Sequence, residues 1–401
     1  MLTVRDAHAR IIAAFEPLPA EMVSVADAAG RVLASPPAAR LTQPPSDLSA
    51  MDGYAVRAED VPAVPSTLTL VGQAPAGGSY DHALKPGETV RIFTGGPLPM
   101  GADAIVIQED TKAEGSKITV LEAPTPGRHV RKAGLDFTAG DTPFAAGRIL
   151  TTRDIALAAA MNHPWLSVRR KPRVAILSTG DELVMPGEPV GRNQIVSSSG
   201  IAVAALVRAW GGEPTLFDIA RDDAALIQDR IAAGAQHDLL ITLGGASVGD
   251  HDHARPALMR LGLKLAVEKI AVRPGKPTWF GATQQGLVLG LPGNPASALA
   301  CAALFLRPVM DALLGRDPSD CIATRRARLM HPLPANGPRE HYLRARLDSD
   351  EEGMQTARAF EDQDSSLISV FAAANALIRL PADAPDLPEG ALVDVLPLEG
   401  A

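Results

Sequence analysis

The sequence predicts a multidomain α/β protein with a doubly wound parallel sheet at its centre. From about residue 172, near-continuous apolar runs such as "RVAILSTG" and "DLLITLGG" alternate with helical segments such as "SSGIAVAALVRAWGG". Strands buried on both faces read as apolar runs, and helices between them are typical of a parallel sheet. A chain of 401 residues is also long for one hydrophobic core, which favours two to four domains.

The segments on either side of this α/β region follow other patterns. Residues 3–16, 25–34 and 151–161 have the apolar spacing and capping residues of helices. Between about 46 and 140, short apolar runs separated by Gly and Pro predict a β-rich region. After Asp317 the chain is again strand-rich and punctuated by proline, which predicts a small β domain.

Composition excludes some classes of function. The net charge of −8 argues against a general nucleic-acid binder, which needs an excess of cations to neutralise phosphates. The basic clusters at 128–132, 169–173 and 324–328 are expected to be solvated, although an anionic small molecule could use one of them. Cys301 and Cys321 lie outside any CxxC pattern, so neither a disulfide framework nor a zinc site is expected.

Nothing in the sequence suggests secretion or a membrane. The first residues, "MLTVRDAHARIIAAF", carry charge early and lack the core of a signal peptide. No apolar run approaches the length of a transmembrane helix. We therefore expect a cytoplasmic protein without a membrane partner.

Polar motifs follow the strands of the predicted sheet. "STGDEL" follows one strand, "ARDD" the next, "GGASVGDHD" a third and "LPGNPAS" a later one. In an open parallel sheet, ligands bind beyond the carboxyl ends of the strands. We therefore expect these four motifs to meet at one edge of the sheet.

The glycine-rich loop after the third strand has the composition of an anion-binding loop. Gly244, Gly245 and Gly249 permit positive φ and let backbone N–H groups approach an anion, and Ser247 adds a hydroxyl donor. "LPGNPAS" offers similar donors where a helix begins. The Asp and Glu side chains of the neighbouring motifs would repel an anion bound here. They are compatible with a bound phosphate only if a cation such as Mg²⁺ bridges the carboxylates to it. The motifs together predict a phosphorylated ligand and a divalent metal.

Each motif also has a purely structural interpretation. Asp250 or Asp252 could cap a helix that begins near His253 as readily as it could bind a metal. Asp222 and Asp223 could likewise cap a helix over 224–233. The "HDH" triplet is not favoured as a zinc site, because adjacent residues rarely share a face and no third soft ligand is evident.

"VRPGKPTWFG" (272–281) places Arg273 and Lys276 on a Pro-Gly turn. It lacks the spacing of a Walker loop. A charged turn between strands and a cationic patch for an oxyanion are equally compatible with it.

Taken together, the motifs resemble those of a known family. The motifs in question occur in this order: "SAMDGYAVR" (49–57), "IFTGGPLPMGADAIVIQED" (92–110), "STGDEL" (178–183), "GGASVGDHD" (244–252), "RPGKP" (273–277) and "LPGNPAS" (291–297). They closely resemble the molybdopterin molybdenumtransferases, the MoeA proteins, whose relatives include the gephyrin and Cnx E domains. The resemblance extends to "QDSSLISVFAAANAL" (363–377).

The resemblance implies a fold and an activity. Four domains are implied: an extended helical segment (1–45 plus 141–171), an inserted β-rich domain (46–140), a molybdopterin-binding α/β domain (172–318) and a β-barrel-like C-terminal domain (319–401). The family transfers molybdenum from molybdate to adenylated molybdopterin with Mg²⁺ and releases AMP. Its members are homodimers with an active site between the subunits, and they work with other proteins of molybdenum cofactor biosynthesis.

The resemblance also implies roles for individual residues. The catalytic positions that match are Asp52, Asp136, Glu182, Asp222, Asp252 and Lys276, of which Glu182, Asp222 and Asp252 would hold the metal. The substrate-binding positions are Thr94, Arg131, Thr179, Gly180, Asp181, Gly244, Gly245, Ser247, Gly249, Arg273, Pro292, Gly293, Asn294, Pro295, Arg344 and Ser365. Asp52, Arg131 and Asp136 of one subunit are expected to face the cleft of the other.

Two other classes of function remain open at this point. A non-catalytic scaffold could bind the pterin without converting it, because capping roles would preserve the same acids. Another enzyme with a similar α/β domain would be a molybdopterin adenylyltransferase or a nucleotide pyrophosphatase, and the long segment over 46–140 and the C-terminal domain disfavour the adenylyltransferase.

Overall fold

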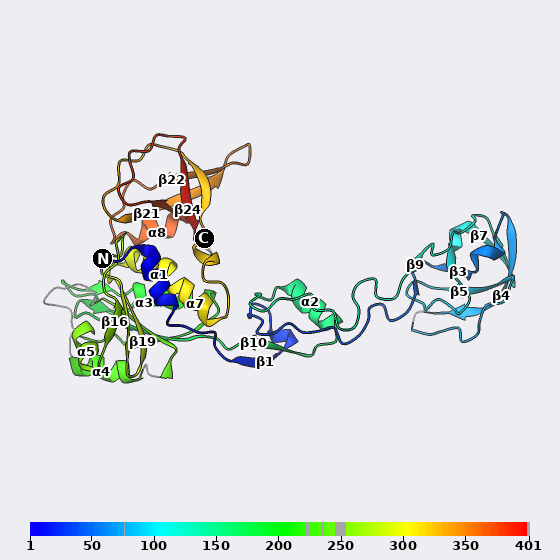
Figure 1. Ribbon diagram of the computed structural model, residues 1–401, viewed down its shortest axis with the longest axis horizontal. Coiled ribbons are helices and arrows are strands. Elements are labelled where there is room, and N and C mark those ends of the chain that lie inside the picture. Colours follow the sequence, from blue (N-terminus) through cyan, green and yellow to red (C-terminus); the bar gives the residue numbers. More distant parts are fainter. Residues whose placement is uncertain (76, 222–223, 234–235, 245–253, 399–401) are drawn as a thin grey trace.

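The computed structural model describes residues 1–75, 77–221, 224–233, 236–244 and 254–398. The molecule is elongated (Figure 1). The α/β sheet and a C-terminal barrel lie at one end, and a β-rich region lies at the other end. A narrow connection formed by two separate stretches of chain joins them.

The central sheet has six strands in the order β14-β11-β15-β19-β18-β16. Their bounds are β11 (Arg173–Ser178), β14 (Glu213–Leu216), β15 (Leu239–Leu243), β16 (Lys264–Val267), β18 (Trp279–Thr283) and β19 (Gly286–Leu291). The first four strands in this order are parallel, as predicted, but β18 is antiparallel to both of its neighbours. Only Gln284 and Gln285 separate β18 from β19, which is too short for the crossover that parallel strands need. The sheet is therefore mixed at one edge.

Helices cover both faces of this sheet. One face packs against α1 (Val4–Ile12), α3 (Ser199–Ala209), α6 (Pro295–Cys301) and α7 (Arg307–Leu313), and the other against α4 (Ala224–Ala233) and α5 (Ala254–Arg260). Side chains of β11 alternate between the two cores: Ile176 belongs to the first, and Ala175 and Leu177 to the second. The doubly wound arrangement predicted from the apolar runs is confirmed.

One helix of the core is unusually long and apolar. α6 continues through a π-helical stretch (Ala302–Leu306) into α7, so that Pro295–Leu313 is one helix. By length and composition it could cross a membrane, but 94% of its apolar window is buried inside the protein. It is the core helix of the α/β region.

The β-rich region holds a second sheet, in the order β6-β3-β5-β4-β8-β7. Its strands are β3 (Gly53–Val56), β4 (Ser66–Ala74), β5 (Glu88–Ile92), β6 (Ala104–Ile107), β7 (Thr111–Glu114) and β8 (Lys117–Val120). The short strands β2 (Leu48–Ser49) and β9 (Val130–Arg131) pair where the chain enters and leaves this region. Entry and exit are therefore side by side, as expected for an insertion.

The C-terminal strands close into a barrel. β20 (Arg325–Leu329), β21 (Glu340–Ser349), β22 (Gln355–Ala359), β23 (Ala376–Leu380) and β24 (Leu392–Pro397) form the ring β21-β22-β20-β24-β23, and β23 pairs back to β21. The short helix α8 (Ile368–Ala373) lies between β22 and β23 in the chain. β17 (Val272–Arg273), which comes from the α/β part of the sequence, pairs in parallel with the start of β21.

The connection is a ribbon of β1 (Ala20–Ser24) and β10 (Trp165–Arg169) with α2 (Thr152–Ala160) beside it. The predicted helices over 3–16 and 151–161 form as α1 and α2. The helix predicted over 25–34 was wrong. Only a 3₁₀ turn forms at Val25–Asp27, because Gly30 has φ +76° and Val32 and Leu33 form bridges to other segments. The limits of the four domains stay predictions.

The start of α2 gives a testable prediction for the connection. Thr151 and Asp154 form a capping box, and Arg148 Nη2 donates to Asp154 Oδ1 at 2.9 Å. The Arg148 guanidinium, together with hydrogen bonds from Thr151, lowers the pKa of Asp154 to about 2. The carboxylate therefore stabilises the folded state above its unfolded pKa of roughly 3.9, and this stabilisation is lost as pH falls towards about 2.

Replacing the side chain by an amide (Asp154→Asn) should destabilise α2 by about 1 kcal/mol at pH 7, as the loss of a cap does. Hydrogen exchange of the α2 amides measures this directly. Asp141→Asn, at an exposed carboxylate in the same connection, is a control that should leave α2 unchanged. Equal protection of α2 in wild type and Asp154→Asn would contradict the expectation.

Candidate functional site

The exits of neighbouring strands of the α/β sheet are joined by backbone hydrogen bonds. Thr179, directly after β11, donates its N–H to the carbonyl of Leu243 at the end of β15 (3.0 Å). Gly180 donates to the carbonyl of Ala220, which follows β14 (3.2 Å). The predicted convergence of these exits is confirmed. Because both N–H groups are already paired, Thr179 and Gly180 shape this edge and leave no N–H free for a ligand.

Glycines allow the exits to approach one another closely. Gly244 has φ +89°, and a Cβ on it would lie 2.7 Å from the carbonyl oxygen of Thr179. A Cβ on Gly293, in the loop after β19, would lie 3.4 Å from the Cα of Gly244. The "GG" and "LPGNPAS" motifs are therefore neighbours, as expected from their positions after adjacent strands.

The predicted acids lie partly on this edge. Asp181 and Glu182 are exposed, and the Glu182 carboxylate is folded back over Gly180, where a Cβ would meet Oε2 at 2.6 Å. The following predicted residues lie outside the described part of the chain: Asp222, Gly245, Ser247, Gly249 and Asp252. Within the described part, no group of three His, Cys, Asp or Glu side chains could hold a metal ion.

A cavity of about 300 Å³ brings four of the predicted residues together. Arg273, Lys276, Arg344 and Ser365 all line it. Of the two interpretations of "VRPGKP", the cationic patch is the one that the structure favours, because the pairing of β17 with β21 sets Arg273 beside the barrel. Three further lining residues were missed by sequence reasoning: Arg339, His341 and Gln363.

The guanidinium of Arg344 is buried and held by the backbone. Its Nε and its own N–H donate to Gln363 Oε1 (3.1 and 3.0 Å), and its Nη1 donates to the carbonyls of Asp364 and Leu367 (2.9 and 3.2 Å). Burial lowers the pKa of this group. No carboxylate forms an ion pair with it among the described residues. The arrangement fixes the guanidinium at the cavity, where the charges of Asp362 and Asp364 also act on it.

The cavity adjoins the loop after β19. Asn294 Nδ2 donates to Ser365 Oγ (2.6 Å), and the N–H of Ala296 donates to the Ser365 carbonyl (3.1 Å). Ala296 and Ser297 are themselves lining residues. The predicted residues Pro292, Gly293, Asn294 and Pro295 therefore lie between the strand exits and the cations.

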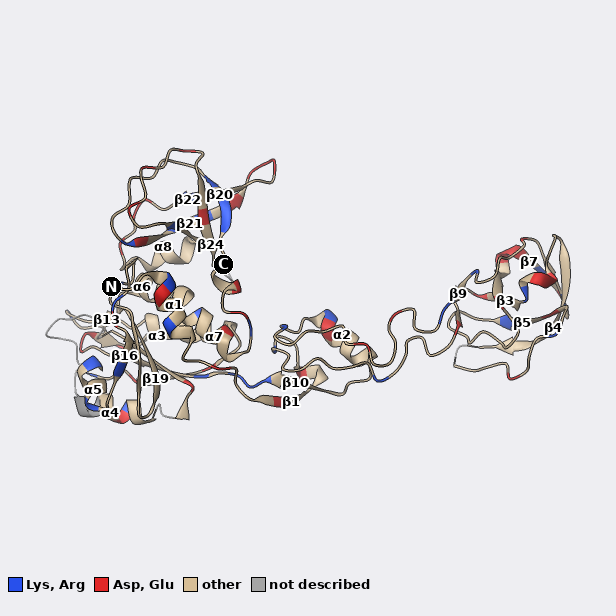
Figure 2. Cartoon of the chain, viewed as in Figure 1, with Lys and Arg blue, Asp and Glu red and all other residues tan. Residues whose placement is uncertain are grey.

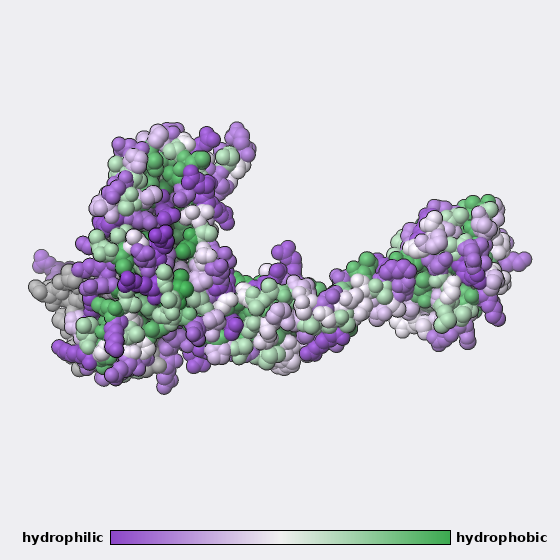
Figure 3. Space-filling view, in the orientation of Figure 1, coloured by the Kyte–Doolittle hydropathy of each residue, from purple (hydrophilic) through white to green (hydrophobic). Residues whose placement is uncertain are grey.

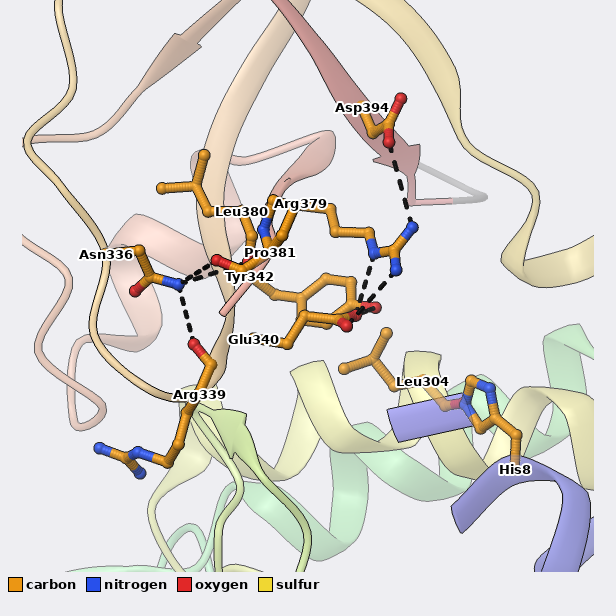
Figure 4. A network of polar contacts seen from close by, with 10 residues as sticks. All are labelled: His8, Leu304, Asn336, Arg339, Glu340, Tyr342, Arg379, Leu380, Pro381 and Asp394. Carbon is orange, nitrogen blue, oxygen red and sulfur yellow. Dashed lines mark hydrogen bonds and ion pairs between the residues drawn. The ribbon is translucent and has the colours of Figure 1, made fainter. Parts of the chain in front are cut away.

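A polar network fixes the start of β21, which supplies His341 and directly follows Arg339 (Figure 4). Asn336 Nδ2 donates to the carbonyls of Arg339 (2.8 Å) and Pro381 (2.7 Å). The Glu340 carboxylate accepts from Tyr342 Oη (2.6 Å) and Arg379 Nε (3.0 Å). The network holds the start of the strand beside which these cations lie, and its Asn336 and Leu380 also line a neighbouring cavity.

A larger cavity of about 730 Å³ adjoins the first. The two share Arg273, His341, Gln363 and Asp364. Phe360 and the loop 331–337 contribute to the wall of the larger one. The pair offers a small cationic compartment beside a wider one of a size that suits an organic ligand.

The cations of this site determine the protonation of His341. Burial and the charges of Arg273, Arg339 and Arg344 lower its pKa to about 4. The imidazole is therefore neutral at pH 7, and acidification from about pH 6.5 towards pH 4 destabilises the folded state, because the unfolded chain binds the proton more readily.

We expect the His341 resonance in an NMR titration to have its midpoint near pH 4, and the midpoint to rise in Arg344→Ala. His341→Asn identifies the resonance. A midpoint near 6.5 would contradict the burial and charge described above.

The predicted residues of the inserted region lie at the opposite end of the molecule (Figure 1). Asp52 Oδ1 accepts from both the N–H and Oγ1 of Thr94 (2.7 and 2.8 Å), and these bonds lower the pKa of Asp52. Arg131 lies in β9, and Asp136 follows shortly after; both are exposed. Within one chain the structure does not bring these four residues to the cationic cavity.

Comparison with known proteins decides the family. The chain is 38% identical over 369 residues to "Molybdopterin molybdenumtransferase" of Nostoc sp., covering 90% of this chain and 85% of that protein. The chain belongs to the MoeA family. It is also 32% identical to the protein of that name from Haemophilus influenzae, over 99% of this chain and 98% of the relative.

The likeness to MoeA proteins extends over the whole fold. A crystal structure described as a "molybdopterin biosynthesis moea protein" from Pyrococcus horikosii matches with a TM-score of 0.88 and 31% identity, over 100% of both chains. Three family models match in order: "MoeA N-terminal region (domain I and II)" at 2–162, "Probable molybdopterin binding domain" at 175–312 and "MoeA C-terminal region (domain IV)" at 326–398. The cationic cavity lies where the second and third regions meet, since Lys276 belongs to one and Arg344 to the other.

Proposed function

We propose that this chain transfers molybdenum from molybdate to adenylated molybdopterin, with Mg²⁺-dependent release of AMP. The observation that carries the proposal is the cationic cavity beside the strand exits. Molybdate is a compact dianion, and Lys276, Arg273 and the fixed guanidinium of Arg344 offer it positive charge, while Ser365 adds a hydroxyl. Relatives named molybdopterin molybdenumtransferase support the activity.

The side chains act by position and charge. Arg344 is preorganised by Gln363 and by backbone carbonyls, so holding an oxyanion there requires no rearrangement of the guanidinium. The wider cavity and the strand exits would hold the pterin and its nucleotide next to the oxyanion. No nucleophilic side chain is required: an oxygen of water or molybdate displaces AMP at the phosphoanhydride, and the dithiolene sulfurs of the pterin take up the molybdenum as molybdate loses oxygen as water.

Mg²⁺ suits the donor set at the strand exits. Carboxylate oxygens are the ligands that this hard cation prefers, and Glu182 lies at the edge where Asp222 and Asp252 follow neighbouring strands in the sequence. We assign these three carboxylates as its ligands and Asp181 to the nucleotide. When bound, the cation would neutralise negative charge on the AMP leaving group.

We further propose a homodimer in which the inserted region of one subunit completes the site of the other. Asp52, Thr94, Arg131 and Asp136 belong to the predicted inserted region, which lies at the opposite end of the molecule from their own cavity (Figure 1). The ribbon also exposes large apolar side chains, Met22 (61%) and Trp165 (55%), on the connection seen in Figure 3. Exposed apolar surface of this kind is typical of an interface. We place the enzyme in the cytoplasm, with partners from the same biosynthesis.

The decisive assay measures AMP release from adenylated molybdopterin with Mg²⁺, with and without molybdate. Wild type should show release that molybdate stimulates, and Asp222→Ala should show little. Tight pterin binding without AMP release would instead identify a scaffold. Transfer of AMP from ATP to molybdopterin, with release of pyrophosphate, would identify an adenylyltransferase.

Complementation between inactive subunits tests the shared site. Asp52→Ala and Lys276→Ala should each be inactive alone. When the two are co-expressed, half of the dimers are mixed, and each mixed dimer has one site with both residues intact, so activity should recover to roughly one quarter of wild type. Absence of recovery, with mixed dimers demonstrated by differential tags, would show that both residues serve the same chain.

A further inference from the structure

A second cationic cavity lies where the ribbon joins the α/β region. It has a volume of about 400 Å³ and shares no lining residue with the two cavities described above. Five cations line it: Arg31, Lys171, Arg208, Arg307 and Arg316. Figure 2 shows Lys and Arg along the stretch where the ribbon reaches the sheet. No Asp or Glu is among its described lining residues.

Only part of this charge is compensated. Asp311 accepts from Arg307 Nε (3.3 Å) and Arg316 Nη1 (2.5 Å), and Glu21 pairs with Arg31. Lys171 and Arg208 form no ion pair and donate no side-chain hydrogen bond within the described chain. Lys171 and Arg208 therefore leave two positive charges that no carboxylate of the described chain pairs with, in a protein whose net charge is −8. A concave surface of one sign concentrates its field on an anion.

The remaining wall of the cavity is apolar. Val32, Ile149, Trp210 and Leu314 contribute to it, and Ile149 is 40% exposed. The Arg307 guanidinium lies 5.4 Å from the centre of the Trp210 ring, so this cation is held against the aromatic part of the cavity wall. A ligand that fits this wall has an organic body as well as negative charge.

We propose that this cavity binds a small organic diphosphate, of the class of a nucleoside diphosphate. A diphosphate offers negative charge to Lys171 and Arg208, and arginines bind phosphate in a bidentate manner. The ligand touches Arg31 of the connection, Lys171 of the link between β10 and β11, and Arg208 at the end of α3. Binding therefore holds the ribbon against the α/β region.

Calorimetric titration with pyrophosphate and with ADP tests the site. The titrations use full-length protein that carries Arg344→Ala, without added Mg²⁺, and the binding assigned to this cavity is the part that changes at Lys171 and Arg208, because the strand exits are proposed to hold a nucleotide of their own. We expect one saturable site per chain, weakened at least tenfold by Lys171→Ala with Arg208→Ala, since each lost charge-assisted hydrogen bond is worth about that factor. Arg153→Ala, an exposed arginine of α2, is the matched control and should bind as the parent does.

Comparing ADP with pyrophosphate tests the apolar wall separately from the cations. Tighter binding of ADP than of pyrophosphate supports the apolar wall, and equal binding overturns it. Slower hydrogen exchange in β1 and β10 on binding supports the clamping of the ribbon. Absence of saturable binding, or equal binding by the double variant with a native circular-dichroism spectrum, overturns the site. None of these outcomes depends on AMP release.

Discussion

Arg344→Ala is expected to lower the rate of molybdate-dependent AMP release by about 10²- to 10³-fold, the loss typical when a preorganised donor to a developing negative charge is removed. The side chain is 4% exposed and is held on three sides by Gln363, Asp364 and Leu367. Truncation therefore removes both the charge and the fixed direction of the donors. Release measured at saturating pterin separates this effect from weakened binding of the substrate.

Two further variants define what Arg344 contributes. Arg344→Lys keeps the charge but lacks the planar fork, so we expect an intermediate rate. Arg346→Ala removes an exposed arginine of the same strand, which pairs with Asp348, and should stay within about twofold of wild type because exposed pairs contribute little. If Arg344→Ala and Arg346→Ala had similar rates, the cavity would not be the site of the oxyanion.

Asp311→Ala should lower the free energy of unfolding of the α/β region by about 3–5 kcal/mol, the usual cost of breaking a buried ion pair from one side. Asp311 is 0% exposed and accepts from both Arg307 and Arg316. Without it, Arg307, which is 6% exposed, stays buried and loses the carboxylate that accepts from its Nε. Urea unfolding followed by tryptophan fluorescence reports this region, since Trp210 lies beside Arg307 and Trp279 is in the core.

The matched control removes a carboxylate from an exposed pair. Asp348→Ala should cost less than about 1 kcal/mol, because Asp348 and Arg346 are both more than half exposed. A loss of less than 1 kcal/mol in Asp311→Ala as well would mean that the buried arginines find other partners.

The strand exits were predictable because they follow from a general rule. Parallel strands end at one edge, so "STGDEL", "GG" and "LPGNPAS" had to meet if the apolar runs were strands. The antiparallel course of β18 was not visible, because the pattern of a buried strand does not reveal its direction. The helix predicted over 25–34 was wrong for a different reason. Its apolar residues have helical spacing, but the positive φ of Gly30 and pairing with distant segments prevent a helix from forming.

The cationic cavity was only half predictable. Lys276 and Arg344 were expected to act together because of the family resemblance, but their proximity depends on the pairing of β17 with β21, which no local pattern encodes. Arg339 and His341 follow from the same pairing and were therefore missed. Gln363 is the first residue of the motif "QDSSLISVFAAANAL", but its hydrogen bonds to Arg344 are visible only in the three-dimensional structure.

The long buried helix has a mechanical consequence. Its first turn carries Ala296 and Ser297, which line the candidate active site, and Arg307 near its other end lines the second cationic cavity. Nineteen residues of helix span about 28 Å. Because the core around it is close-packed, an axial displacement imposed at one end is transmitted to the other rather than absorbed by neighbours. The π-helical stretch at Ala302–Leu306 lies on this rod between the two cavities.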